Sequence, residues 1–263
     1  MIRRAAAMAA SGLLAACVTT PEVSAPRIEG YLPAASVQAL AQTLPAPPAP
    51  DSADDRADRA ASAALRRFEH TDRWLMATAH AELSPPLALQ HFDCALGVRT
   101  ADADGIPALK RLAQRLMHDA VDLAQAASVR FDRPRPVALD AERAACVRLD
   151  AEGRNRTAWP SRPALYAVAY AEALAAAAPD RAEAVRAIGR ALGDSAAICA
   201  LNSPADVEAG RALARQLVQA QAQDAAWRAD VAAASDEIVR LRATGRTHPA
   251  CAAERRALDT AGL

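Results

Sequence analysis

Cysteine and histidine offer the widest chemistry in this chain, and their spacing limits what that chemistry is. No two of the five cysteines are separated by just two residues, so the C-x-x-C pattern of a structural zinc site is missing. We therefore expect no metal site. His118 and Asp119 are adjacent, but neighbouring residues of a helix point in different directions and do not form a catalytic pair. We expect surface or interface positions, away from any catalytic site, for the five histidines: His70, His80, His91, His118 and His248.

The first cysteine ends a segment that is typical of an export signal. A pair of arginines precedes a mostly apolar run over residues 5–16, which is too short to span a bilayer as a stable helix. The run ends in Leu-Ala-Ala-Cys, which resembles the lipobox of bacterial lipoproteins, where the cysteine, here Cys17, carries the lipid. The alternative is an ordinary signal cleaved just before that cysteine.

We therefore expect residues 1–16 to be a lipoprotein signal peptide. The mature protein is then expected in the cell envelope, facing the periplasm, with the lipid on Cys17 as its sole attachment to the membrane. The valine that follows the cysteine favours the outer membrane over the inner one.

The other cysteines are Cys94, Cys146, Cys199 and Cys251. An even number in an oxidising compartment indicates two disulfides, and four cysteines allow three connectivities. The alternative is four buried free thiols.

Charge and composition favour a helical protein without a nucleic-acid partner. The 31 Lys and Arg residues balance 31 Asp and Glu, so the formal net charge is zero and gives no reason to expect nucleic acid or an anionic membrane surface. Alanine is abundant, whereas glycine (10 residues) and aromatic residues (3%) are few, which favours helices over strands.

Proline marks the boundary of the expected domain. Prolines clustered near residue 48 exclude a helix, so we expect residues 17–52 to be an extended tether that then wraps the domain. Residues 53–263 are expected to form a single all-α domain, with an irregular stretch over residues 137–160. Apolar residues recur at helical spacing in seven stretches that are separated by breaks. We expect helices at about 54–81, 86–97, 106–128, 164–177, 180–197, 205–222 and 224–243.

Several short segments, in order along the chain, resemble one enzyme family. They are Gly30-Tyr31-Leu32-Pro33, Thr71-Asp72-Arg73-Trp74, Phe92-Asp93-Cys94-Ala95-Leu96-Gly97, Asp119-Ala120, Pro179-Asp180-Arg181 and Asp206-Val207-Glu208-Ala209-Gly210-Arg211. Together they resemble the class A bacterial non-specific acid phosphatases of the type-2 phosphatidic-acid phosphatase superfamily. The resemblance implies a single helical domain of the class A acid phosphatase or vanadium haloperoxidase type. It also implies hydrolysis of phosphomonoesters through a phosphohistidine, without a cofactor.

The family's first two catalytic motifs align with this chain, but reactive positions differ. In the first motif Ser128 stands where the family has a phosphate-binding lysine, while Arg135-Pro136 is kept. In the second motif Pro160-Ser161 is kept. Arg162 replaces a glycine there, and Pro163 replaces the histidine that protonates the leaving alcohol.

The third motif lacks its nucleophile. Ser195 and Asp206 are kept, Ala196 replaces an arginine, and Asn202 replaces the histidine that attacks phosphorus. An amide nitrogen is not a useful nucleophile, because its lone pair is delocalised into the carbonyl group. The resemblance therefore implies a degenerate, inactive member, in which we expect Asn202 to hydrogen-bond Asp206.

Three of these positions are candidates for an anion site. Arg135, Ser161 and Arg162 are candidates for holding phosphate or another anion, since arginine binds such groups bidentately. The alternative is that Arg162 fills the former pocket and pairs with an acid. We expect Arg130 and Arg133 to be solvated.

The family fold also implies the pairing Cys146–Cys199, which leaves Cys94–Cys251, and it is compatible with a homodimer. Three functions stay open. One is an inactive pseudophosphatase acting as a scaffold or weak anion binder, and another is an active phosphatase with a rearranged site. The last is a structural lipoprotein unrelated to phosphatases, which is favoured if the kept motif residues fail to meet.

Overall fold

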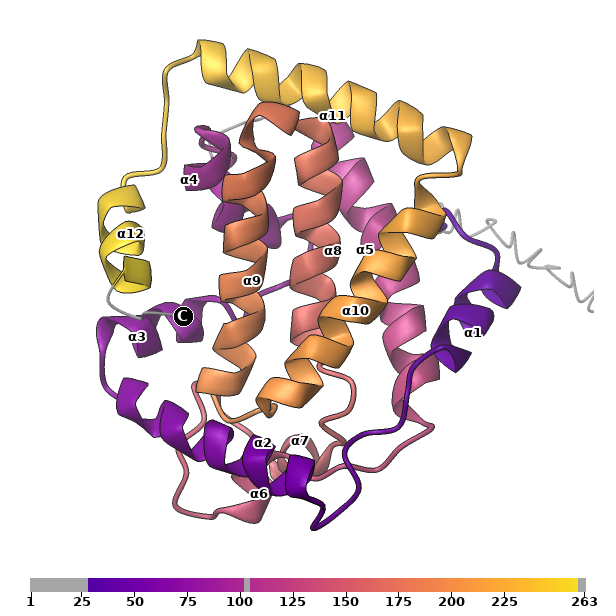
Figure 1. The fold of residues 1–263 in the computed structure, drawn as a ribbon. Coiled ribbons are helices and arrows are strands. Elements are labelled where there is room, and N and C mark those ends of the chain that lie inside the picture. The colour runs from indigo at the N-terminus through magenta and orange to yellow at the C-terminus, as the bar shows by residue number, and fades with distance from the viewer. Residues whose placement is uncertain (1–27, 102–104, 260–263) are drawn as a thin grey trace, which may run out of the picture.

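The structure, a computed structural model, describes residues 28–101 and 105–259, which form an all-helical body (Figure 1). No strand occurs within these two ranges, so the predicted all-α class is confirmed. The predicted signal peptide and Cys17 lie outside the described residues. Within the described part, none of the helices combines the length and the apolar character needed to cross a bilayer.

The described chain is a succession of α-helices with three 3-10 helices between them. In order they are α1 (Ala34–Gln42), α2 (Ala53–Ala64), η1 (Leu65–Phe68), α3 (Asp72–Ala79), η2 (Leu87–Phe92), α4 (Asp93–Leu96), α5 (Pro107–Ser128), α6 (Pro136–Leu139), α7 (Ala151–Asn155), α8 (Arg162–Ala177), η3 (Pro179–Arg181), α9 (Ala182–Ile198), α10 (Pro204–Gln221), α11 (Ala225–Ala243) and α12 (Cys251–Asp259).

Helix α8 is the centre of the molecule, with α9, α10, α5 and α11 packed around it (Figure 1). Half of its residues are alanine, and most of those alanines are buried, which lets neighbouring helices come close. Glycine completes the fit at two points. A Cβ on Gly189 of α9 would lie 2.3 Å from Ala171 Cβ, and one on Gly210 of α10 would lie 2.3 Å from Ser161 O.

Side-chain caps fix where α8 and α10 begin. Ser161 caps α8 by accepting a hydrogen bond from Ala164 N, and Ser203 forms a capping box with Asp206 at the start of α10. Because Ser161 N also donates to Asp206 O at 3.0 Å, the two helix starts are joined directly.

The long amphipathic helices were predicted with small errors at their ends. Apolar periodicity predicted α5, α8, α9, α10 and α11 within two residues of the observed bounds. The stretch expected at 54–81 is instead α2, η1 and α3, because the chain turns at His70, whose φ is 64°, and Thr71 caps a new helix. The stretch expected at 86–97 is η2 followed by the short α4.

The expectation that residues 17–52 contain no helix was wrong. Helix α1 lies before the proline cluster and contains no proline itself. It buries Val37 and Ala41 against α5 and α10, so this part of the segment belongs to the core. Helix α12 was not predicted either, because its alanines and charges give only one buried residue, Ala257.

Both disulfides have the pairing that the family resemblance implied. Cys146 joins the loop after α6 to Cys199 at the C-terminus of α9, and Cys94 of α4 joins Cys251, the first residue of α12. The alternative of four free thiols is therefore wrong for this structure. The second bridge fastens the last described helix to the body.

Candidate functional site

Three loops meet at the end of the bundle where α2, α6 and α7 lie (Figure 1). Ala158 N in the loop before α8 donates to Arg133 O at 2.7 Å, in the loop after α5. Val137 N, in α6, donates to Ala200 O at 3.1 Å, in the loop between α9 and α10. These backbone bonds bring together the segments that carry the three predicted motifs.

Arg133 is the charged centre of this end. Its guanidinium donates to Asp206 Oδ1 and Asp58 Oδ2, both at 2.7 Å, and to Asp55 Oδ1 at 3.2 Å. Arg133 is 7% exposed and Asp206 is fully buried, so water screens these ion pairs little. Burial raises the pKa of Asp206 to about 6, although Arg133 beside it acts in the opposite direction.

The prediction that Arg130 and Arg133 are solvated was wrong. Asp55 and Asp58 of α2 lie three residues apart and so share one face of the helix, which is turned toward Arg133. Arg130 is half-buried. It donates to two backbone oxygens, one in α1 at 2.7 Å and one just after α1 at 2.9 Å.

Asn202 is buried, and both ends of its amide are bonded. Ser161 Oγ donates to Asn202 Oδ1 at 3.0 Å, and Asn202 Nδ2 donates to Ala158 O at 2.7 Å. The predicted hydrogen bond from Asn202 to Asp206 is not formed, because the Asp206 carboxylate is bound to Arg133 and to Ser203 N. Ser161 is fully buried as cap and donor, so it is not open to an external anion.

A cluster of arginines lies beside this buried network. Arg162 donates to Ser128 Oγ at 2.8 Å, and no carboxylate pairs with Arg162 among the described residues. Burial, together with the positive charges of Arg156 and Arg162, lowers the pKa of Arg135 to about 10. Since Nε of Arg135 and of Arg162 is buried without a partner, the cluster holds positive charge and unused donors together.

Ser195 does not join the other kept motif residues. Its hydroxyl faces α3, where it contacts Arg73 Nη1 at 2.9 Å and His80 Nδ1 at 2.8 Å. Ala196, the next residue, contacts the loop that carries Asn202, because its carbonyl oxygen accepts hydrogen bonds from Leu201 N and Asn202 N. Six kept or replaced positions thus lie in the network or cluster, while Ser195 belongs to a separate contact; the six are Ser128, Arg135, Ser161, Arg162, Asn202 and Asp206.

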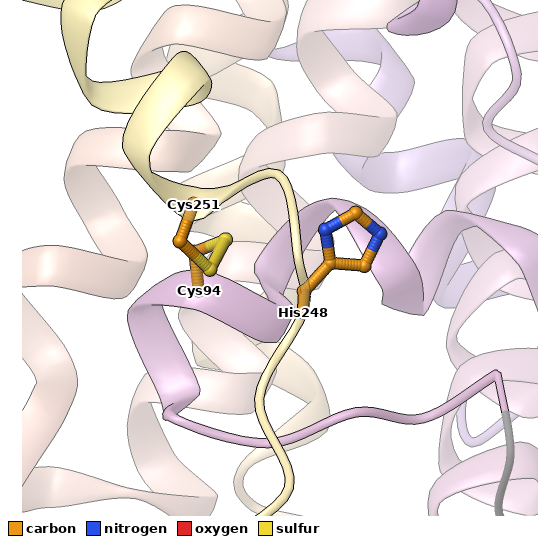
Figure 2. Close-up of side chains that lie close together, drawn as sticks. All are labelled: Cys94, His248 and Cys251. Carbon is orange, nitrogen blue, oxygen red and sulfur yellow. A yellow bond between two sulfur atoms is a disulfide. The ribbon is translucent and has the colours of Figure 1, made fainter.

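A metal site is not available at the one set of three close ligand groups in the described residues. Cys94, His248 and Cys251 have side-chain ligand atoms within 4.8 Å of one another. Figure 2 shows that the two cysteines are joined in a disulfide, with the His248 ring beside it. Sulfur in a disulfide is not a thiolate, which is the form that binds metal.

The sequence analysis found the motif residues of this site but missed residues outside the motifs that contact them. Asp55 and Asp58 had one signal, two acids on the same helix face, but nothing in the sequence shows which loop that face covers. Arg156 lies outside all three motifs and is found only from its position near Arg135.

Comparisons with known proteins agree with the phosphatase resemblance. No family model matches this chain. The chain is 28% identical over 183 residues to a protein named acid phosphatase from Zymomonas mobilis subsp. mobilis, and the match covers 69% of each protein. This protein is therefore similar to an acid phosphatase, and its helical fold with two disulfides agrees with that likeness.

Proposed function

We propose that this chain is an acid-phosphatase-like protein of the bacterial envelope that binds anions weakly or acts as a scaffold and does not hydrolyse phosphomonoesters. The observation that carries this proposal is the bonding of Asn202, at the position where the resemblance has the attacking histidine. Its amide donates to Ala158 O and accepts from Ser161, so it is a structural group inside the fold.

The chemistry at this position supports inactivity. An amide in place of a nucleophilic imidazole removes covalent catalysis, which costs on the order of a millionfold in a well-studied hydrolase. Pro163 stands in the first turn of α8, where the resemblance has the general acid, and its side chain has no proton to give.

Two of the replaced positions complement each other. Arg162 donates to Ser128, so the arginine at the family's glycine position bonds the serine at the family's lysine position. The long arginine side chain supplies from α8 a positive charge that the resemblance places on α5. Positive charge is thus present near Arg135 although the lysine is not.

The arginine cluster supports weak anion binding. Arg162 repels Arg135, as does Arg156, which also pairs with Glu152 at 3.5 Å; an anion beside Arg135 relieves that repulsion. Arg156 takes the place of Ser161 among the candidate anion-binding residues, because the Ser161 hydroxyl is already used. Phosphate, sulfate and carboxylates all match guanidinium donors, so the cluster does not select one anion.

The envelope location is part of the proposal. Leu-Ala-Ala-Cys at Cys17 and two disulfides both agree with export to an oxidising compartment. We expect the wild-type protein in the membrane fraction, and a Cys17→Ser variant released in soluble form when cell fractions are separated and blotted. Equal membrane association of the two proteins would contradict the lipid anchor.

The test of inactivity is phosphate release by the purified protein. A generic phosphomonoester is incubated at roughly pH 5 to 7, the range in which a histidine-based site is expected to work. The Zymomonas acid phosphatase serves as the positive control. We expect no release above background, and release that disappears in an Arg135→Ala variant would instead support an active, rearranged site.

A further inference from the structure

A cleft of about 600 Å³ lies between α3, η2 and α12, and none of the residues that line it belongs to the three motifs. This volume is in the usual range for sites that hold a small organic molecule. We call it the α3–α12 cleft. Its α12 wall is fixed to the body by the Cys94–Cys251 disulfide, which lies at the start of that helix.

The mouth of the cleft is apolar. Leu75 of α3 and Leu87 of η2 are 66% and 50% exposed, among the most exposed large apolar side chains in the described chain. Met76, a flexible side chain that adapts to different shapes, also lines the cleft. An occupant with an apolar body would remove this surface from water.

His80 at the floor presents a hydrogen-bond acceptor. Ser195 Oγ lies 2.9 Å from Ala191 O and 2.8 Å from His80 Nδ1, and the tautomer with the proton on Nδ1 lets the hydroxyl donate to Ala191 O while it accepts from His80. Nε2 of His80 is then unprotonated and has no partner among the described residues. Burial lowers the pKa of His80 well below its usual value, so the ring is neutral at pH 7.

His91 presents a second acceptor. Its Nε2 donates to the carbonyl oxygen of Glu82 at 2.7 Å, which leaves Nδ1 with a free lone pair. Burial lowers the pKa of His91 as well, so this ring is also neutral at pH 7. The two rings meet edge to face, with their centroids 5.3 Å apart.

Glu254 of α12 is a carboxyl group without a counter-charge. It lines the cleft and is half-buried, and its side chain forms no hydrogen bond or ion pair among the described residues. Burial and the nearby Asp93 raise its pKa to about 7. A carboxylate in such surroundings is stabilised by a cation that enters the cleft.

We propose that the α3–α12 cleft binds a small organic cation, a protonated amine carried on an apolar body. The polar lining favours a ligand that donates hydrogen bonds. It offers two imidazole lone pairs and the carboxyl groups of Asp72, Glu82 and Glu254 as acceptors. Arg256 is the one arginine or lysine among the described residues that line it. The ammonium group lies between the histidines and Glu254, and the apolar body lies against Leu75 and Leu87.

Affinity for the amine rises with pH. The charged and titratable groups near Glu254 are Asp93 and the others that line the same cleft: Asp72, His80, Glu82, His91, His248 and Arg256. Glu254 becomes ionised as pH passes through about 7, while an alkylamine keeps its proton to well above pH 8. Binding is therefore tighter at pH 8 than at pH 6.

Titration calorimetry on the purified full chain tests this inference with three matched probes: phenylbutylammonium, phenylbutanol and phenylbutyrate. We expect saturable binding of the ammonium ion, weaker binding of the alcohol and none of the carboxylate. Glu254→Gln is expected to weaken binding of the ammonium ion at pH 8 about tenfold, the value of one partly buried ion pair. Glu183→Gln, which changes an exposed acid of α9, is the control and leaves binding unchanged.

Three results would each overturn the proposal. One is equal or tighter binding of phenylbutyrate, and another is no saturable binding of phenylbutylammonium at millimolar concentration. The third is unchanged affinity in Glu254→Gln when that variant unfolds in urea like the wild type. Because the cleft shares no residue with the arginine cluster, these outcomes do not depend on the proposed lack of phosphatase activity.

Discussion

At the scale of single residues, one arginine organises the site end of the molecule. Arg133 neutralises part of the charge of Asp55, Asp58 and Asp206, which come from two helices. The sequence shows Arg133 directly before a proline but gives no partner for it, because ion pairs between distant segments follow from the fold.

Removal of Arg133 is expected to be strongly destabilising. An Arg133→Met variant leaves three buried carboxylates facing one another, and loss of one partner of a buried ion pair costs about 3–5 kcal/mol. Urea unfolding measures the loss. Arg59→Met is the matched control, because it removes an arginine with a 44% exposed side chain from the same Asp55 and should cost less than about 1 kcal/mol. Equal losses for the two variants would contradict this role for Arg133.

Restoration of single residues tests why the site is inert. Asn202→His alone is expected to give no phosphate release, because position 163 still lacks a proton donor. The combined change of Ser128→Lys, Arg162→Gly, Pro163→His, Ala196→Arg and Asn202→His is expected to give measurable release from a phosphomonoester. Activity in the single variant, or none in a folded combined variant, would count against the alignment of the motifs with this chain.

At the scale of the elements, periodicity predicted those helices that have one clear buried face. It failed for α1 and α12, which are short and lie at the ends of the domain, and at His70, where a left-handed turn divides a continuous pattern. The motif loops were located by resemblance, but the contacts within them were not. Asn202 binds Ala158 O rather than Asp206 because the loop before α8 passes directly over it.

Close packing of α8 and α10 makes Gly210 the most sensitive glycine at the site. A Cβ there would lie 2.3 Å from Ser161 O, and the backbone cannot move without disturbing the cap of α8. Gly210→Ala is expected to cost about 1–3 kcal/mol by overpacking, measured as a shift in thermal unfolding. Gly105→Ala, which meets nothing within 4 Å, is the control and should have little effect.

The two disulfides are expected to act on different elements. Without Cys94–Cys251, α12 keeps one buried residue, Ala257, so it should detach while the body stays folded. In a Cys94→Ala/Cys251→Ala variant, trypsin is expected to cleave rapidly after Arg255 or Arg256, which are exposed on α12. The Cys146→Ala/Cys199→Ala variant should resist cleavage there, and equal cleavage of both variants would contradict this division.

At the scale of the whole molecule, buried titratable groups set the pH range of stability. Glu254 and Asp93 have folded pKa values of about 7 and 6, above their unfolded values, so the stability they contribute is complete at low pH and is lost as pH rises through those values. His80 and His91 act in the opposite direction. Their lowered pKa values make the folded state lose stability as pH falls below the unfolded value of about 6.5.

The free energy of unfolding is therefore expected to be largest at mildly acidic pH. Glu254→Gln should remove part of the loss between pH 5 and 8, on the order of 3 kcal/mol at most, and should move the maximum toward higher pH. Urea unfolding across this pH range measures the effect. A variant with the same pH profile as the wild type would show that Glu254 has an ordinary pKa.

The central proposal for the whole protein, which is similar to an acid phosphatase, is that it has no group able to accept a phosphoryl group. The most direct measurement is rapid quenching of the purified protein and a phosphomonoester in alkaline denaturant, in which a phosphohistidine survives, followed by intact-mass analysis beside the Zymomonas acid phosphatase. We predict that this protein keeps its unmodified mass under conditions in which a phosphatase that works through a phosphohistidine gains one phosphoryl group. A phosphoryl group on any side chain of this protein, formed and lost during turnover, would contradict the claim.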